Sequence, residues 1–294
     1  MQATEGAYRK LSRWVGNCLN SAVSLAKITL LACKAPRLDT LRNSAINRCV
    51  VLGSGPSLTA SLEHYMHETE VSFLAVNTFV FSDAFEKVKP EFYVILDPGM
   101  WLADHSITRN TLAMLQQKTT WKLRLMIPHS ARKSAFVQSL ETHPFIQVVY
   151  LNYIVFKGFT SLAHRYYRKN KAMPQSQNVL VAALFLAVNL GFKRVELLGA
   201  DHDWHRTLAV NDENVVCVKQ VHFYEQEQEV KLVPFKKGLH SGETFRMDEI
   251  FFAWAKVFYG YHTVRQYAVE QGTTILNATP GSFVDAFERI THHD

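Results

Sequence analysis

The stretch CVVLGSGPSL at residues 49–58 decides the fold, because a short apolar run flows directly into a glycine turn. Runs of this kind are typical of a strand buried on both faces of a parallel sheet. Ser57 or Thr59 is the candidate cap for a following helix. Two glycines let the backbone approach a ligand closely, and free N–H groups at the start of a helix favour a phosphate or a ribose. The alternative is a tight strand–helix turn with no ligand.

Further apolar runs alternate with helix-like segments along the rest of the chain. The runs are Ser72–Val76, Phe92–Leu96, Leu123–Ile127, Gln147–Leu151, Val195–Gly199 and Thr274–Leu276, and the predicted helices cover 59–67, 82–88, 107–117, 132–140, 177–190, 247–271 and 282–290. This alternation predicts an α/β fold, a Rossmann-like, mainly parallel sheet with helices on both faces. Residues 201–243 are polar and interrupt the rhythm, with possible hairpin strands at 215–221 and 230–234. We expect them to form an insertion or lid within a domain covering 48–294.

Polar residues follow almost every predicted strand. Ligands bind beyond the carboxyl ends of the strands in such sheets, so these residues are the candidate ligand-binding set. The set comprises Gly53, Ser54, Gly55, Pro56, Ser57, Asn77, Asp97, Asp201, Asp203, Trp204 and His205.

Two further segments add candidates. Asp201 and Asp203 have the spacing to bridge a divalent metal ion, Mg²⁺ or Mn²⁺, to a diphosphate, or to orient sugar hydroxyls without a metal. Ser176, Gln177 and Asn178 precede a predicted helix and form either a neutral, anion-friendly pocket or a plain cap. His240, before the predicted helix 247–271, is a candidate general base.

The positive charge lies in the N-terminal segment. The chain has 294 residues and a net charge of +6, and the first 48 residues hold eight Lys or Arg against two acids, so the remainder is neutral. A nucleic-acid enzyme would carry its charge on the working surface, so we expect no nucleic-acid partner. Residues 8–34 have helical apolar spacing with basic flanks. Residues 1–47 are therefore predicted to form an amphipathic helix and linker, which lies on an anionic membrane surface, packs on the domain or mediates homo-oligomerisation.

Cysteine usage suggests the compartment. The chain has four cysteines, no CxxC motif and no secretory signal with a cleavage site. A disulfide scaffold or a cysteine zinc site is not expected, and a reducing cytoplasm fits best. With the basic helix, the expectation is a cytoplasmic protein that can sit at the inner face of the membrane.

The motifs resemble a known superfamily over residues 49–290. VLGSGPSL at 51–58, AVN at 75–77, KPEFYVILD at 89–97 and AVNLGFKRVELLGAD at 187–201 are similar to segments of the glycosyltransferase family 42 bacterial sialyltransferases and of the related domain of unknown function 115, which includes 6-hydroxymethylpterin diphosphokinase-like proteins. The segments QSQNVL, GADHDW, HFY and NATPGSFVDAFER resemble proteins from bacterial surface-polysaccharide gene clusters.

This resemblance implies a GT-A-like domain that binds a nucleotide-activated sugar. It points to the glycine turn and Asn77 as the site for a CMP-activated donor, and to His240 as the base that takes a proton from a glycan or lipid-linked glycan acceptor. The paired tyrosines of the sialyltransferases are not visible after Asp201, and Trp204, His205 or Tyr224 are the candidates to replace them. No cofactor is then required. The alternatives are a metal-dependent diphosphokinase or phosphotransferase using Asp97, Asp201 and Asp203, and a non-catalytic nucleotide-binding protein.

Overall fold

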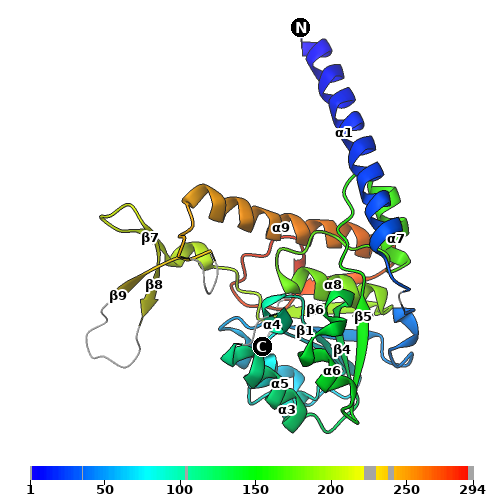
Figure 1. Cartoon of the computed structure of the whole chain (residues 1–294), viewed down its shortest axis with the longest axis vertical. Helices are drawn as coiled ribbons and strands as arrows, with labels where there is room; N and C mark the ends of the chain where they lie inside the picture. The colour runs from blue at the N-terminus through cyan, green and yellow to red at the C-terminus, as the bar shows by residue number, and fades with distance from the viewer. Residues whose placement is uncertain (1, 35, 103–104, 222–229, 238–241, 291–294) are drawn as a thin grey trace.

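The computed structural model describes residues 2–34, 36–102, 105–221, 230–237 and 242–290 (Figure 1). Its centre is an eight-stranded, fully parallel sheet in the order β11-β10-β6-β1-β2-β3-β4-β5. The strands are β1 (Arg48–Leu52), β2 (Val71–Val76), β3 (Phe92–Val94), β4 (Leu123–Pro128), β5 (Ile146–Leu151), β6 (Arg194–Leu198), β10 (Thr274–Asn277) and β11 (Glu288–Arg289). The predicted α/β fold with a parallel sheet is confirmed.

Alternate residues of the buried strands divide the interior into two hydrophobic cores. On β1, Cys49 and Val51 belong to one core, whereas Val50 and Leu52 belong to the other. The almost entirely apolar helix α8 (Val179–Asn189) fills the first core beside α7 (Thr160–Arg168) and α9 (Met247–Glu270). The second core is covered by α2 (Leu58–Leu62), α3 (Phe85–Val88), α4 (Gly99–Leu102), α5 (Ser106–Lys118) and α6 (Ala135–Glu141). Helices therefore cover both faces, as expected.

The strand order reverses at β1, and this positions the site. The chain runs outward from β1 through β2 to β5, then returns so that β6 lies on the other side of β1. Leu52 is level with Ala75 of β2 and with Leu198 of β6. The segments after these three strands therefore meet at one edge, at the crevice where α/β sheets bind ligands.

Two appendages extend from this body (Figure 1). Helix α1 (Gln2–Leu31) confirms the predicted N-terminal helix; Ser21, Ser24 and Ile28 are buried against the body, whereas its N-terminal half projects from it. The insertion forms a separate antiparallel sheet of β7 (Leu208–Val210), β8 (Val216–Val221) and β9 (Val230–Pro234), which confirms the two hairpin strands.

One predicted helix is wrong. Residues 282–290 form an irregular segment that ends in β11. Side chains hold this segment away from helical geometry: Asn277 Nδ2 donates to the Val284 carbonyl at 3.0 Å, and Ser282 Oγ donates to the Ala200 carbonyl at 2.6 Å. The first bond satisfies a backbone carbonyl that a helix would have paired internally, and the second ties the segment to the chain after β6. Helices α4 and α7 and strand β11 were not predicted.

Candidate functional site

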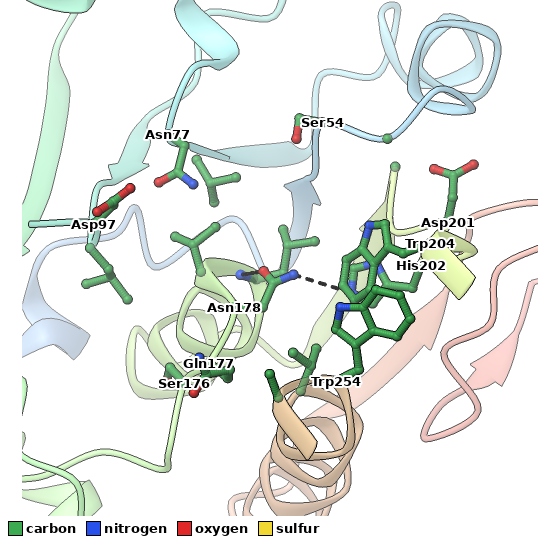
Figure 2. Close-up of a pocket in the computed structure, with 18 of the residues that line it drawn as sticks. Ser54, Asn77, Asp97, Ser176, Gln177, Asn178, Asp201, His202, Trp204 and Trp254 are labelled. Carbon is green, nitrogen blue, oxygen red and sulfur yellow. Dashed lines mark hydrogen bonds between the residues drawn. The ribbon is translucent and has the colours of Figure 1, made fainter. Parts of the chain in front are cut away.

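A cavity of about 870 Å³ opens at the carboxyl edge of the sheet (Figure 2). Its volume falls in the range of small-molecule sites. The wall combines the segments after β1, β2, β3 and β6 with the start of α8 and one face of α9. Predicted residues that line it are Ser54, Gly55, Pro56, Asn77, Asp97, Ser176, Gln177, Asn178, Asp201, Asp203 and Trp204.

The glycine turn is packed against the end of β6. Gly53 N–H donates to the Leu198 carbonyl at 2.8 Å, and Gly55 N–H donates to the Gly199 carbonyl at 2.9 Å. A Cβ on Gly55 would lie 1.9 Å from an Asp201 carboxylate oxygen. The glycines are thus required by this close approach of two turns. The expectation of free N–H groups is wrong for Gly53 and Gly55, because β6 already uses them.

Asp201 holds the same turn from the other side. Its carboxylate accepts hydrogen bonds from Ser57 Oγ at 3.0 Å and from Ser57 N–H at 3.3 Å. Ser57 makes no side-chain cap, and α2 has only five residues, so the predicted capping by Ser57 is also wrong. Asp201 therefore joins the β1 and β6 turns.

The facing wall carries polar groups from β2 and β3 (Figure 2). Asn77 has φ of 47°, and its backbone carbonyl accepts from the buried Tyr93 hydroxyl at 2.5 Å. This backbone conformation is uncommon outside glycine, asparagine and aspartate. The Asn77 Oδ1 is buried and has no hydrogen-bond partner among the described residues. Asp97 accepts from Gly99 N–H at 2.9 Å and is exposed in the cavity.

An aromatic wall formed by His202, Trp204 and Trp254 lies opposite Asn77 and Asp97 (Figure 2). The Trp204 ring stacks on the His202 ring at 4.2 Å between centroids, and Trp254 lies 5.7 Å from Trp204. Flat faces of this kind bind bases and sugar rings. The sequence prediction assigned a role to Trp204, included His202 within the segment 201–205 without a role of its own, and missed Trp254 and Tyr153. His202 stood inside a quoted motif, whereas no local signal marked the other two.

His202 connects the cavity to the core. Its Nε2 lies 2.7 Å from the hydroxyl of buried Tyr261 and 3.5 Å from Asn178 Nδ2. Burial lowers the pKa of His202 to about 4, against an opposing effect of Asp203. The imidazole is therefore neutral near pH 7, and its Nε2 accepts the Tyr261 hydrogen bond. Asn178 also caps α8, since its Oδ1 accepts from Leu180 N–H at 2.8 Å.

The cavity lining contains no lysine or arginine among the described residues, but it includes the carboxylates of Asp97, Asp201 and Asp203. The Asp203 carboxylate has no hydrogen-bond or ion-pair partner within the described part of the chain. No group of three or more histidine, cysteine or acidic side chains is arranged to hold a metal ion among the described residues. Asp201 and Asp203 remain the residues that would hold one.

Several predicted residues are not in the cavity wall. Gly53 and Ser57 lie behind it in the turn, and His205 instead packs against Phe283 at 4.5 Å between ring centroids. Tyr224 and the candidate base His240 lie outside the described residues. Beyond Trp204, the described residues of the insertion do not line the cavity, so its role as a lid stays a prediction.

The chain is similar to a known protein family and, more distantly, to a solved structure. The family model for 6-hydroxymethylpterin diphosphokinase MptE-like proteins matches residues 25–207. No curated protein matches the sequence. Among solved structures, the MAf glycosyltransferase from Magnetospirillum magneticum AMB-1 is similar at 12% identity and a TM-score of 0.47, over 93% of this chain and 38% of that one. The chain thus spans well under half of that protein, and so distant a likeness carries no argument about activity.

Proposed function

The chain belongs to the 6-hydroxymethylpterin diphosphokinase MptE-like family, and within that family we propose that it is a glycosyltransferase of bacterial surface-polysaccharide assembly. The donor is a nucleotide-activated sugar, CMP-activated and sialic-acid-like or Kdo-like. The acceptor is a glycan or lipid-linked glycan hydroxyl.

The character of the cavity carries this proposal. Its described wall offers amides, hydroxyls, aromatic rings and three carboxylates, with no lysine or arginine. Two or three phosphates placed there without a metal ion would be repelled by these carboxylates. A CMP-sugar brings one phosphate to this wall, where a nucleoside diphosphate sugar or a triphosphate brings two or three, and the carboxylate of a sialic-acid-like or Kdo-like sugar has to lie away from Asp97, Asp201 and Asp203.

The proposed roles of Asn77, Trp204 and Asp203 follow from their positions in the cavity, and that of His240 follows from the sequence resemblance. Asn77 presents a buried, unpartnered amide oxygen beside Ser54 and is suited to accept from the nucleoside. Trp204 offers a ring face for the base or the sugar, and the unpaired Asp203 orients hydroxyls. His240 accepts the acceptor proton as the acceptor oxygen bonds to the anomeric carbon, and the bond from that carbon to the phosphate oxygen breaks to release CMP.

The test is CMP release from CMP-activated sugars by the full chain. Removing a general base costs about 10²–10⁴-fold in rate, so we expect a loss in that range for His240→Ala. Asp203→Asn and Trp204→Ala should also reduce turnover. His205→Ala is the matched control, because His205 lies in the same segment but outside the cavity wall. Full activity of His240→Ala with an unchanged fold would refute the assignment of the base.

A metal-dependent phosphotransferase is the second candidate, favoured by the family description and by the three carboxylates in the wall. Asp201 and Asp203 would hold Mg²⁺, which would screen the phosphates from the carboxylates of the wall, Asp97 on the facing side included. Activity or nucleotide binding that disappears in EDTA distinguishes this candidate from the first.

The exposed face of α1 supports a proposal about location. Leu11, Trp14 and Leu19 are each more than half exposed, beside the cations of Lys10 and Arg13. Apolar side chains with basic flanks bind anionic membrane surfaces. No helix in the described ranges is long and apolar enough to cross a bilayer. We propose that α1 rests on the surface and holds the enzyme near lipid-linked acceptor.

A further inference from the structure

A second cavity, of about 430 Å³, lies beside the first at the foot of α1. Tyr153, Ser176 and Gln177 line both cavities, so the two adjoin along these residues. The remaining wall comes from residues 20–27 of α1, from the segment around Lys157 and from Gln175. A molecule bound in the second cavity would therefore adjoin one bound in the first.

The two neighbouring cavities differ in charge. Among the described residues, Lys27 and Lys157 are the charged ones in the wall of the second cavity, and no carboxylate of that part of the chain lines it. Neither ammonium group forms an ion pair or hydrogen bond with a described residue. The first cavity has carboxylates and no lysine or arginine in its described wall. An anionic group is thus bound more favourably in the second cavity than in the first.

Hydrogen bonds fix the backbone at Lys157 against the turn of α1 that carries Lys27. Ser24 Oγ on α1 donates to the Lys157 carbonyl and accepts from the Lys157 N–H, both at 2.9 Å. Lys27 lies three residues beyond Ser24, on the same side of the helix. Gly158 packs so closely that a Cβ there would lie 2.1 Å from Ser21 Oγ. The backbone of the cavity is therefore organised before any ligand arrives, which lowers the entropy cost of binding.

We propose that this second cavity is the acceptor subsite, and that it binds an anionic group of the acceptor, a phosphate or a carboxylate, through Lys27 and Lys157. This inference rests on the proposed glycosyl transfer and names its acceptor class. The amide and hydroxyl groups of Gln175, Gln177 and Tyr153 contact the acceptor sugar. The reacting hydroxyl then lies at the shared wall, next to the donor.

Lysine acetylation of the full chain, read by mass spectrometry, tests the subsite. The probes are inorganic pyrophosphate and glucuronate, with glucose as the neutral control. We expect pyrophosphate or glucuronate to slow acetylation of Lys27 and Lys157 several-fold, while Lys10 on the exposed part of α1 is unchanged. The probe that protects identifies the anion as a phosphate or an acidic sugar. Protection by neither, or equal protection of Lys10, would overturn the proposal.

Single variants separate this subsite from the donor site. Lys27→Ala should abolish protection of Lys157, whereas Lys10→Ala, the same change on the same helix, should leave it intact. Both lysines of the cavity are exposed, so the fold tolerates the change. Stabilisation by CMP should persist in Lys27→Ala. If the anions protect the two lysines from acetylation but CMP does not stabilise the chain, the donor proposal is refuted and the anion site is retained. If CMP stabilises the chain but the anions do not protect the lysines, the anion site is refuted and the donor proposal is retained.

Discussion

His202 lines the cavity, and its protonation makes the stability of the fold depend on pH. The folded protein holds its pKa at about 4, against roughly 6.5 for a free histidine. Below about pH 6.5 His202 is protonated in the unfolded chain, whereas in the folded chain it stays neutral until the pH approaches 4. The free energy of unfolding therefore falls as the pH drops from about 6.5 towards 4.

We predict that His202→Gln removes this component. Between pH 7 and pH 5 the wild-type chain should lose about 2 kcal/mol through His202, and the variant should lose correspondingly less. Urea unfolding at both pH values measures the difference. Equal losses in the two proteins would show that His202 is not held neutral by burial.

Replacing Gly55 by alanine tests the close approach of the turns after β1 and β6, and the same replacement at Gly16 in α1 is the matched control. Gly55→Ala would place Cβ 1.9 Å from Asp201 Oδ2 and 2.7 Å from the Gly199 carbonyl oxygen, whereas a Cβ at Gly16 meets nothing within 4 Å. We expect Gly55→Ala to lower the melting temperature and weaken nucleotide binding. Gly16→Ala should stabilise α1 by up to about 1 kcal/mol. Thermal unfolding checks both, and a neutral Gly55→Ala would contradict the described contact of the turns.

At the scale of elements, β6 stabilises the fold through a buried ion pair and leads at its carboxyl end into the cavity. Its first half carries Glu196, which is fully buried and accepts from Arg48 Nε at 2.7 Å, Arg48 Nη2 at 2.9 Å and Tyr65 Oη at 2.7 Å. These partners, with Arg194, lower the pKa of Glu196 to about 2 against the effect of burial. The strand's other end leads to Asp201 and the cavity.

Glu196→Gln should therefore destabilise the fold without altering the site. Removing one partner of a buried ion pair costs about 3–5 kcal/mol, and we expect a loss near the lower value because Arg48 is partly exposed and also pairs with Glu68. Glu213→Gln is the control, because Glu213 is exposed and forms no ion pair with a described residue. Chemical unfolding gives the loss. A changed response to CMP, relative to the variant's own baseline, would contradict the separation of the two ends.

Strands β1 to β6 and β10 were predictable because each is a short, nearly continuous apolar run. Residues 71–76 of β2, for example, are all buried, so their hydrophobicity is enough to mark them. Helix 282–290 was predicted wrongly because its apolar residues have helical spacing, while long-range bonds from Asn277 and Ser282 decide its path. Local pattern carries no information on such partners.

The cavity was predictable where it follows strand ends and not elsewhere. Asn77, Asp97 and Asp201 were found because parallel strands end at one edge. Trp254 lies within α9 and Tyr153 after β5, and only the packing of these elements brings them to the wall. The sequence likewise could not show that the N–H groups of Gly53 and Gly55 are already hydrogen-bonded, because their acceptors lie at the end of β6, some 145 residues further along the chain.

At the scale of the whole molecule, the basic charge and exposed apolar residues of α1 predict binding to anionic membranes. The full chain should float with phosphatidylglycerol vesicles and not with phosphatidylcholine vesicles. Each basic residue near such a surface contributes roughly 1 kcal/mol, so Lys10→Glu with Arg13→Glu should reduce binding more than about tenfold. Lys122→Glu with Lys193→Glu, the same charge change on the body, should not. Equal flotation of both variants would contradict the membrane proposal.

The central claim is metal-independent recognition of a CMP-activated donor, and the most direct test is thermal unfolding of the full chain with CMP, CDP, UDP, GDP and ATP. Each nucleotide is measured in EDTA and again with Mg²⁺ or Mn²⁺. A ligand at one hundred times its dissociation constant stabilises by about 2.7 kcal/mol, a shift of several degrees at this size. We predict that CMP raises the melting temperature in EDTA as much as with metal. A shift only for UDP, GDP or ATP, and only with metal, would contradict the account and favour the phosphotransferase.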